Sequence, residues 1–139
     1  SIDMKPNSKM MKSLLICTMT FMVLVKIQAQ TPNCSQFHDG TFILEDSVSG
    51  ITHIERIGNV QIEENEKMGS RSKLQVEWLD DCTYTLQLMS READEGMHGL
   101  EELILTVKII ETKDNSYIQQ TSANLSPMIL EGEIFKFTD

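Results

Sequence analysis

The chain has 139 residues, with 12 Lys and Arg against 21 Asp and Glu, and a formal net charge of −9 at pH 7. From residue 30 onward the imbalance is larger, with eight basic against 20 acidic residues, a net charge of −12. Nucleic-acid phosphates and anionic membrane surfaces need clustered Lys and Arg, whereas the basic residues here are scattered among carboxylates. Neither is therefore expected as a partner, and the charge suits an exported protein that stays soluble.

The first 29 residues have the pattern of an export signal. A basic start at Met11-Lys12 precedes an apolar core at 13–27, and Ala29 offers a small residue for cleavage. This core is too short to span a bilayer comfortably, although an uncleaved anchor is the alternative interpretation. We expect a periplasmic or secreted protein without stable membrane insertion after cleavage. The predicted parts are an upstream extension at 1–10, a signal peptide at 11–29 and a single β domain at 30–139.

Two cysteines remain once the signal, which contains Cys17, is removed. An even pair in an exported chain is more often a disulfide than two free thiols, so Cys34 and Cys82 are predicted to be bonded. The bridge would tie the mature N-terminus to the middle of the chain and close a loop of 48 residues. The chain-entropy model gives such a bridge roughly 4 kcal/mol, which matters in a domain that buries only a modest core.

Residues 73–88 form the clearest structural pattern, two arms in which apolar and polar side chains alternate. A two-residue loop at Asp80-Asp81 would point the apolar faces of the two arms to opposite sides of the sheet. A three-residue loop at 79–81 keeps those faces together and requires a left-handed conformation at Asp81. We therefore predict a β-hairpin with the second loop. Its cross-strand pairs are Trp78 with Cys82, Val76 with Tyr84 and Leu74 with Leu86.

The rest of the chain after residue 30 also alternates like β-strands, with short turns between and no long helix. Further strands are predicted at 41–45, 51–57, 60–64, 103–111, 117–121 and 131–137. Polar loops are predicted at 65–71 and 122–127, and an exposed loop or one short helix at 90–99. Sequential antiparallel pairing of about eight strands gives an all-β meander. We predict a lipocalin-like small barrel or a strongly curved sheet rather than a sandwich. The adjacent apolar pairs Ile109-Ile110 and Ile134-Phe135 predict positions that are buried on both faces.

The hairpin around Gly58-Asn59 brings three polar residues together. This two-residue turn signal pairs Arg56 with Gln61 and Ile54 with Glu63, so that Arg56, Gln61 and Glu63 share one face. If the face points inward, the polar cluster needs partners inside the barrel and favours a ligand, with Arg56 holding Glu63 or a ligand carboxylate. If it points outward, it is an ordinary cross-strand ion pair. We favour the outward or purely structural interpretation because such surface pairs are common and weak, and we keep the trio as candidate ligand-binding residues.

No catalytic or metal-binding signature is found. His38, His53 and His98 match no metal-ligand spacing, and Asp80-Asp81 is explained by the turn. There is no Gly-x-Ser-x-Gly motif, and Cys82 in a disulfide is not a nucleophile. We therefore expect no enzyme, no metal and no cofactor.

The motifs Cys34-x-x-Phe37, Gly40-x-Phe42, Ile54-x-Arg56, Gln61-x-Glu63, Val76-x-Trp78 and Asp81-Cys82-x-Tyr84-x-Leu86 resemble those of a group of small exported proteins from Bacteroidetes. The resemblance covers most of residues 34–88, and the later half matches only in rhythm. Some members carry a topoisomerase IV label, which the charge contradicts because a short acidic chain has no basic channel for duplex DNA. The resemblance implies that the Arg56, Gln61 and Glu63 positions and the cysteine pair match the group, and it implies no ligand.

Two functions follow from these observations. The first is an exported, non-enzymatic barrel-like protein that binds a small or amphiphilic molecule inside its sheet. The second is a structural or protein-interaction module of the cell envelope, with a filled core and an envelope protein as partner. A cavity lined by Arg56, Gln61 or Glu63 would favour the first function, and a solid interior would favour the second.

Overall fold

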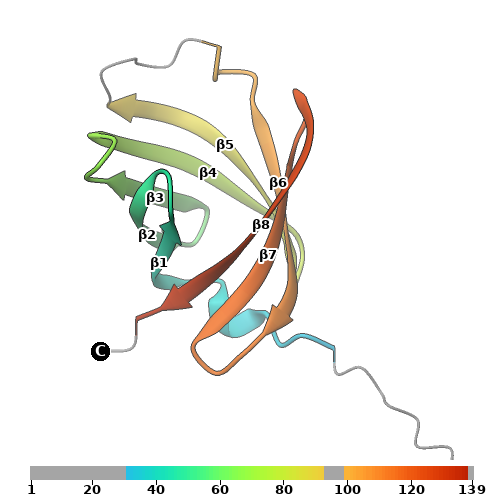
Figure 1. Ribbon diagram of the computed structural model, residues 1–139. Helices are drawn as coiled ribbons and strands as arrows, with labels where there is room; N and C mark the ends of the chain where they lie inside the picture. The colour runs from blue at the N-terminus through green and yellow to red at the C-terminus, as the bar shows by residue number, and fades with distance from the viewer. Residues whose placement is uncertain (1–30, 93–98, 138–139) are drawn as a thin grey trace, which may run out of the picture. The chain divides into compact units, whose positions relative to one another are not determined.

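The computed structural model describes residues 31–92 and 99–137, which form a closed barrel of eight antiparallel strands in sequential order (Figure 1). The all-β meander predicted from the sequence is confirmed, and it closes rather than remaining an open sheet. The predicted upstream extension and signal peptide lie outside the described residues. The strands are β1 (Gly40–Asp46), β2 (Gly50–Ile57), β3 (Val60–Asn65), β4 (Ser70–Asp80), β5 (Thr83–Glu92), β6 (Ile104–Thr112), β7 (Ser116–Ala123) and β8 (Ser126–Lys136).

The last strand is longer than its sequence predicts. Residues 122–127 were expected to form a loop, but β8 already begins at Ser126 and includes Pro127. A proline is tolerated at the start of a strand, where its missing N–H removes no needed ladder bond. The proline therefore marks the beginning of β8, and the β7–β8 connection is a tight hairpin.

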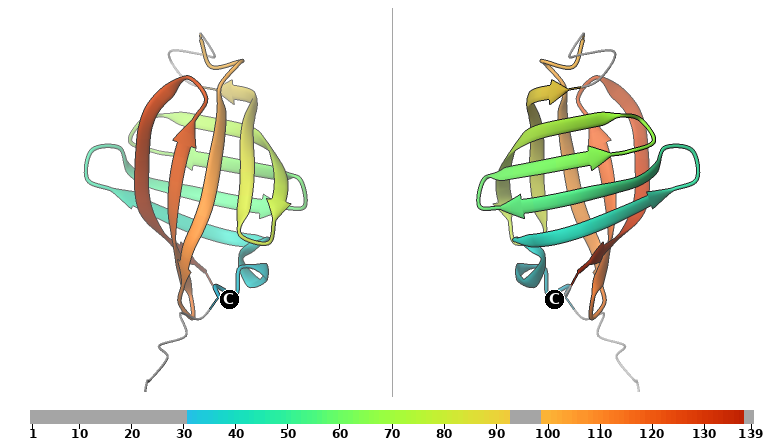
Figure 2. Two further views of the ribbon diagram at one scale, coloured as in Figure 1. Left: turned by 90° about the vertical axis from the view of Figure 1, so that its right-hand side faces the viewer. Right: turned by 90° about the vertical axis from the view of Figure 1, so that its left-hand side faces the viewer.

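The barrel closes through a short seam between its first and last strands. Phe42, Ile43 and Leu44 of β1 pair with Lys136, Phe135 and Ile134 of β8. Beyond this seam, β1 continues to pair only with β2, and β8 only with β7. Strands β1–β4 run across one side of the barrel and β6–β8 run along the other (Figure 2). The wall is thus incompletely hydrogen-bonded at the β1–β8 seam, as it is between β5 and β6 beyond Gln87.

Alternation along the strands fills the interior with apolar side chains. The buried hydrophobic residues form two clusters. The first consists of Cys34, Phe37, Phe42, Ile54, Ile109, Tyr117 and Ile134, and the second of Leu74, Val76, Tyr84, Leu86 and Val107. Burial on both faces was predicted for two adjacent pairs and is wrong, because Ile110 and Phe135 are exposed. A single-layer barrel encloses only its inner face.

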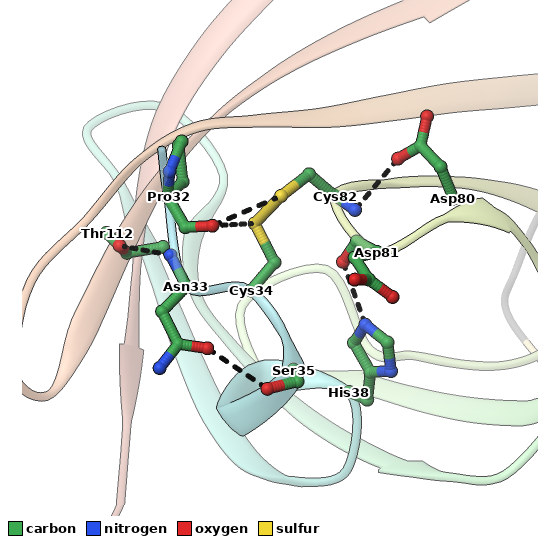
Figure 3. Close-up of a disulfide and its surroundings, with 9 residues drawn as sticks. All are labelled: Pro32, Asn33, Cys34, Ser35, His38, Asp80, Asp81, Cys82 and Thr112. Carbon is green, nitrogen blue, oxygen red and sulfur yellow. Dashed lines mark hydrogen bonds between the residues drawn. A yellow bond between two sulfur atoms is a disulfide. The ribbon is translucent and has the colours of Figure 1, made fainter. Parts of the chain in front are cut away.

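One end of the barrel is closed by the N-terminal segment. The 3₁₀ turn η1 (Ser35–Phe37) inserts the ring of Phe37, which is buried against the ring of Tyr117 at a centroid distance of 5.1 Å. The predicted disulfide between Cys34 and Cys82 joins this turn to the β4–β5 connection (Figure 3). The bridge therefore anchors the segment that closes the barrel.

The β4–β5 hairpin has a different register from the predicted one. Trp78 pairs with Tyr84 and Val76 with Leu86, so each predicted pair is displaced by two residues. The physical reason is a bulge at Leu79, which realigns the apolar faces across a two-residue turn at Asp81-Cys82.

A side chain stabilises that turn. The Asp80 carboxylate accepts a hydrogen bond from the Cys82 N–H at 2.8 Å, which is an Asx-type turn. Asp81 does not adopt the predicted left-handed conformation, because only glycines have positive φ among the described residues. The hydrogen bond in the turn thus explains Asp80 of the acidic pair.

Replacement of Cys34 by Ser should lower the free energy of unfolding by about 2–5 kcal/mol, the usual cost of losing a native disulfide in a small exported domain. Urea unfolding measures this change, with Ser35→Ala as the control because Ser35 is exposed in the same turn. Alkylation should detect two additional thiols only after reduction. Equal stability of the Cys34→Ser and Ser35→Ala variants would contradict an anchoring role for the bridge.

Candidate functional site: a polar cluster beside an internal cavity

The turn between β2 and β3 places the predicted polar trio. Arg56 pairs with Gln61 and Ile54 with Glu63, as predicted from Gly58-Asn59. Gly58 has a φ of +59°, which a tight two-residue hairpin turn of type II′ needs at its first central position. The trio's shared face is confirmed. An outward orientation is wrong, because Arg56 and Gln61 are buried inside the barrel.

The guanidinium of Arg56 is fully buried, with 0% of the residue exposed. Its Nε donates to Gln61 Oε1 at 2.7 Å, and its Nη1 donates to the Phe37 carbonyl at 2.8 Å. Its Nη2 donates to the hydroxyls of Tyr84 at 2.9 Å and Tyr117 at 3.1 Å. Four of the five N–H groups of the guanidinium are thus hydrogen-bonded, which makes its burial tolerable. This explains why an arginine occupies the interior.

Aromatic rings complete the surroundings of this cation. The Arg56 Cζ lies 4.6 Å from the ring centroid of Tyr84, 4.9 Å from that of Phe42 and 5.9 Å from that of Trp78. A cation over the negative face of an aromatic ring is stabilised electrostatically, more strongly where water is excluded. Burial raises the pKa of Tyr84 well above its usual value, so its hydroxyl remains a neutral hydrogen-bond partner.

Glu63 is connected to Arg56 through Gln61. The Gln61 Nε2 donates to Glu63 Oε1 at 2.7 Å, while Gln61 Oε1 accepts from Arg56. The direct Arg56–Glu63 ion pair that we considered is not formed, because the amide of Gln61 lies between the two charges. Burial raises the pKa of Glu63, against the opposing effects of the Gln61 hydrogen bond and of the Arg56 and Arg91 charges.

An internal cavity of about 480 Å³ lies beside this cluster. Its volume is within the range of small-molecule sites, roughly 300–1,000 Å³. Its apolar wall is formed by Leu44, Ile54, Leu86, Leu105, Val107 and Leu130. Its polar wall is formed by Arg56, Gln61, Glu63, Tyr84, Gln119 and Thr121. The arrangement offers apolar contact and several hydrogen-bonding groups to one molecule.

The cavity reaches the surface at the β1–β8 seam. Asp46 and Ser49, at the β1–β2 turn, line it from one side, and Leu130, Glu131 and Gly132 of β8 line it from the other. These residues lie beyond the short stretch in which β1 and β8 are paired. The part of the β1–β8 seam without pairing is therefore also where the cavity opens.

Sequence reasoning missed most of the cluster's partners. Tyr84 was assigned to the core without a role for its hydroxyl, and Tyr117 and the Phe37 carbonyl were not considered. The sequence offered only a general indication of this role. Tyr84 stands at an inward-facing position of its strand, and a buried tyrosine hydroxyl needs a hydrogen-bond partner. Arg91, which lies near Glu63, was also missed.

The histidines do not form a site in the described part of the chain. His38 stacks on Trp78 at a centroid distance of 3.8 Å, and its Nε2 lies 2.8 Å from the Asp81 carbonyl oxygen. His53 is exposed on β2, and His98 lies outside the described residues. Within 31–92 and 99–137, no three His, Cys, Asp or Glu side chains converge on a common point.

Comparisons with protein-family models, curated proteins and solved structures find no match to this chain. In the ranges that the structure describes, no helix has the length and apolar character needed to cross a membrane. The resemblance to exported proteins of Bacteroidetes stays a prediction.

Replacement of Arg56 by Ala should lower the free energy of unfolding by about 3–5 kcal/mol. The substitution leaves a cavity, and the buried groups that now accept hydrogen bonds from the guanidinium lose their donor. The control is Arg71→Ala, since Arg71 forms an ion pair with Glu64 in which both side chains are about half exposed. That variant should lose less than about 1 kcal/mol. Similar losses in the two variants, measured by urea unfolding, would contradict the interior role of Arg56.

The raised pKa of Glu63 gives stability a specific pH dependence. Between the ordinary glutamate pKa and the raised native value, the native state holds a proton that the unfolded chain has released, so stability falls as pH rises. Glu63→Gln removes this contribution. As pH rises through that window, the unfolding free energy of the wild type should therefore fall relative to that of Glu63→Gln. A difference between the two proteins that does not change with pH would contradict the burial of this carboxyl group.

Proposed function

We propose that this protein is an exported, non-enzymatic barrel that binds a small amphiphilic molecule in its internal cavity. The observation that carries the proposal is the cavity of about 480 Å³ lined by Arg56, Gln61 and Glu63. A solid interior, which a purely structural envelope module would have, does not fit this hollow. The polar trio therefore lies where a ligand would meet it.

The cavity wall supports an amphiphile rather than a wholly apolar or wholly polar ligand. Leu86, Leu105 and Val107 of β5 and β6 provide an apolar surface. Gln119 and Thr121 of β7 and Glu63 of β3 provide hydrogen-bonding groups, beside Arg56 and Gln61, which are bonded to each other. A ligand with an apolar body and a polar end satisfies both kinds of surface, because each polar group it meets would otherwise require water.

The β1–β8 seam gives such a molecule an apolar route to the interior. Leu130 lines the cavity and is 58% exposed, and Met128, two residues earlier on the same strand, is 61% exposed. Both side chains lie on the stretch of β8 that is not paired with β1. Their exposure marks the side of the barrel through which we expect the ligand to pass.

The polar groups support binding rather than catalysis. An arginine guanidinium does not release its proton in proteins, and Arg56 is held by four hydrogen bonds. Burial keeps Tyr84 neutral, which makes it a poor base. The Cys34–Cys82 bridge suits an oxidising compartment and so supports export. The acidic balance of the chain argues against nucleic acid as a partner.

A neutral apolar fluorophore, N-phenyl-1-naphthylamine, should bind the wild-type protein with enhanced fluorescence and saturate at one site. Thr121→Phe, which adds bulk to the cavity wall, should weaken this binding at least tenfold by filling the space. Ser122→Phe is the matched control because Ser122 is exposed on the next position of the same strand. Absence of binding to wild type, or equal binding by the two variants, would overturn the proposed function.

A further inference from the structure

A second, smaller cavity adjoins the first. It has a volume of about 170 Å³, and Glu63 and Ser49 line both spaces. Its remaining wall is almost entirely polar, with the hydroxyls of Thr52, Ser70 and Ser72, the amide of Asn65 and the guanidinium of Arg91. We refer to it as the polar chamber. Its surface contrasts with the apolar side of the larger cavity, so the two spaces suit different parts of one molecule.

Arg91 lines this chamber and has one donor that finds no acceptor in the described part of the chain. Arg91 lies on β5 opposite Ser72 of β4. Its Nε is buried and has no hydrogen-bond partner among the residues that the structure describes. Leaving a buried charged donor without an acceptor is costly, so such a group in a folded protein calls for an acceptor in the space beside it. The chamber is large enough for that acceptor to come from a ligand.

The charges around the two cavities indicate the sign of the missing group. Arg56, Glu63 and Arg91 are the charged residues away from the seam that line the two spaces, and together they carry one net positive charge. The other carboxylates that line the larger cavity, Glu45, Asp46 and Glu131, are exposed at the β1–β8 seam. One negative charge beside Arg91 would balance the interior.

A carboxylate suits this position better than a phosphate. Arginine presents Nε–H and Nη–H as a planar fork that matches the two oxygens of a carboxylate. Glu63 lines the same chamber, and it would repel a dianion more strongly than a monoanion. The net charge of −12 beyond residue 29 also disfavours small free anions, which lack apolar contacts to offset the repulsion.

We propose that Arg91 and the surrounding hydroxyls of the polar chamber bind the carboxylate of an amphiphile whose apolar part occupies the larger cavity. This inference rests on the proposed function and specifies the ligand class as a monoanionic, carboxylate-ended amphiphile. Arg91 acts as the anion-binding residue, whereas Arg56 is already committed to internal partners. The polar end of the ligand thus lies in the chamber and its apolar end toward Leu105 and Val107.

Displacement of bound N-phenyl-1-naphthylamine by decanoate and by decan-1-ol tests the inference. Wild type should bind decanoate at least tenfold more tightly than decan-1-ol. Arg91→Gln should weaken decanoate binding at least tenfold and leave decan-1-ol and the fluorophore unchanged. Arg71→Gln is the matched control, since it removes the same charge from the exposed ion pair with Glu64. It should bind both ligands like wild type.

Glu63→Gln is a second variant, and it should change the affinity for decanoate in the opposite direction to Arg91→Gln. It removes the carboxylate that repels the ligand, so the affinity for decanoate should rise relative to the affinity for decan-1-ol. Equal affinity for decanoate in Arg91→Gln and Arg71→Gln, or no preference of wild type for decanoate, would overturn the inference and leave water as the occupant of the chamber. Should Arg91→Gln not fold, an unchanged decanoate affinity in Glu63→Gln overturns it equally. If the fluorophore itself does not bind the wild-type protein, the proposed function, on which this inference rests, is overturned.

Discussion

The buried guanidinium of Arg56 is the interaction on which the arrangement of this barrel depends. It extends from β2 and is hydrogen-bonded to a side chain of β3, a backbone carbonyl of η1 and two tyrosine hydroxyls on β5 and β7. These contacts join strands from both sides of the barrel to the segment that closes its end. A buried charge is acceptable only when nearly all its donors are satisfied, so the positions of all these elements are mutually constrained.

This requirement divides the interior into two regions. Around Arg56, the aromatic rings of Phe37, Phe42 and Tyr117 pack tightly, and the Cys34–Cys82 bridge holds the closing turn in place. Toward the β1–β8 seam, the strands are less completely paired and the side chains leave a hollow. The barrel is therefore solid at one end and open at the other, and the polar trio stands at the boundary between the two.

Glu63 and Arg91 differ from Arg56 in how their charges are balanced. Glu63 accepts one hydrogen bond from Gln61 and is otherwise influenced by two arginines at longer range. Arg91 leaves Nε without an acceptor in the described residues. A charge without its full set of hydrogen bonds is costly in a low-dielectric interior. A ligand would therefore contribute most to stability in the cavities next to Glu63 and Arg91. It would contribute less at the packed end around Arg56, where the hydrogen bonds are already formed.

The strand pattern and the β2–β3 register could be predicted from the sequence alone, because alternation and a Gly58-Asn59 turn are local signals. The Cys34–Cys82 pair followed from the count of cysteines that remain after the predicted signal. The sequence also showed that Arg56, Gln61 and Glu63 share a face. Only the tertiary structure shows which face of this hairpin points inward. Alternation defines two faces without distinguishing the inner from the outer one, and the partners of Arg56 come from residues as distant in sequence as Tyr117. The bulge at Leu79 displaced the β4–β5 register, and no turn signal in the sequence indicates it. The β3–β4 and β4–β5 registers together align Glu63, Ser72 and Arg91 across three strands, which brings Arg91 close to Glu63.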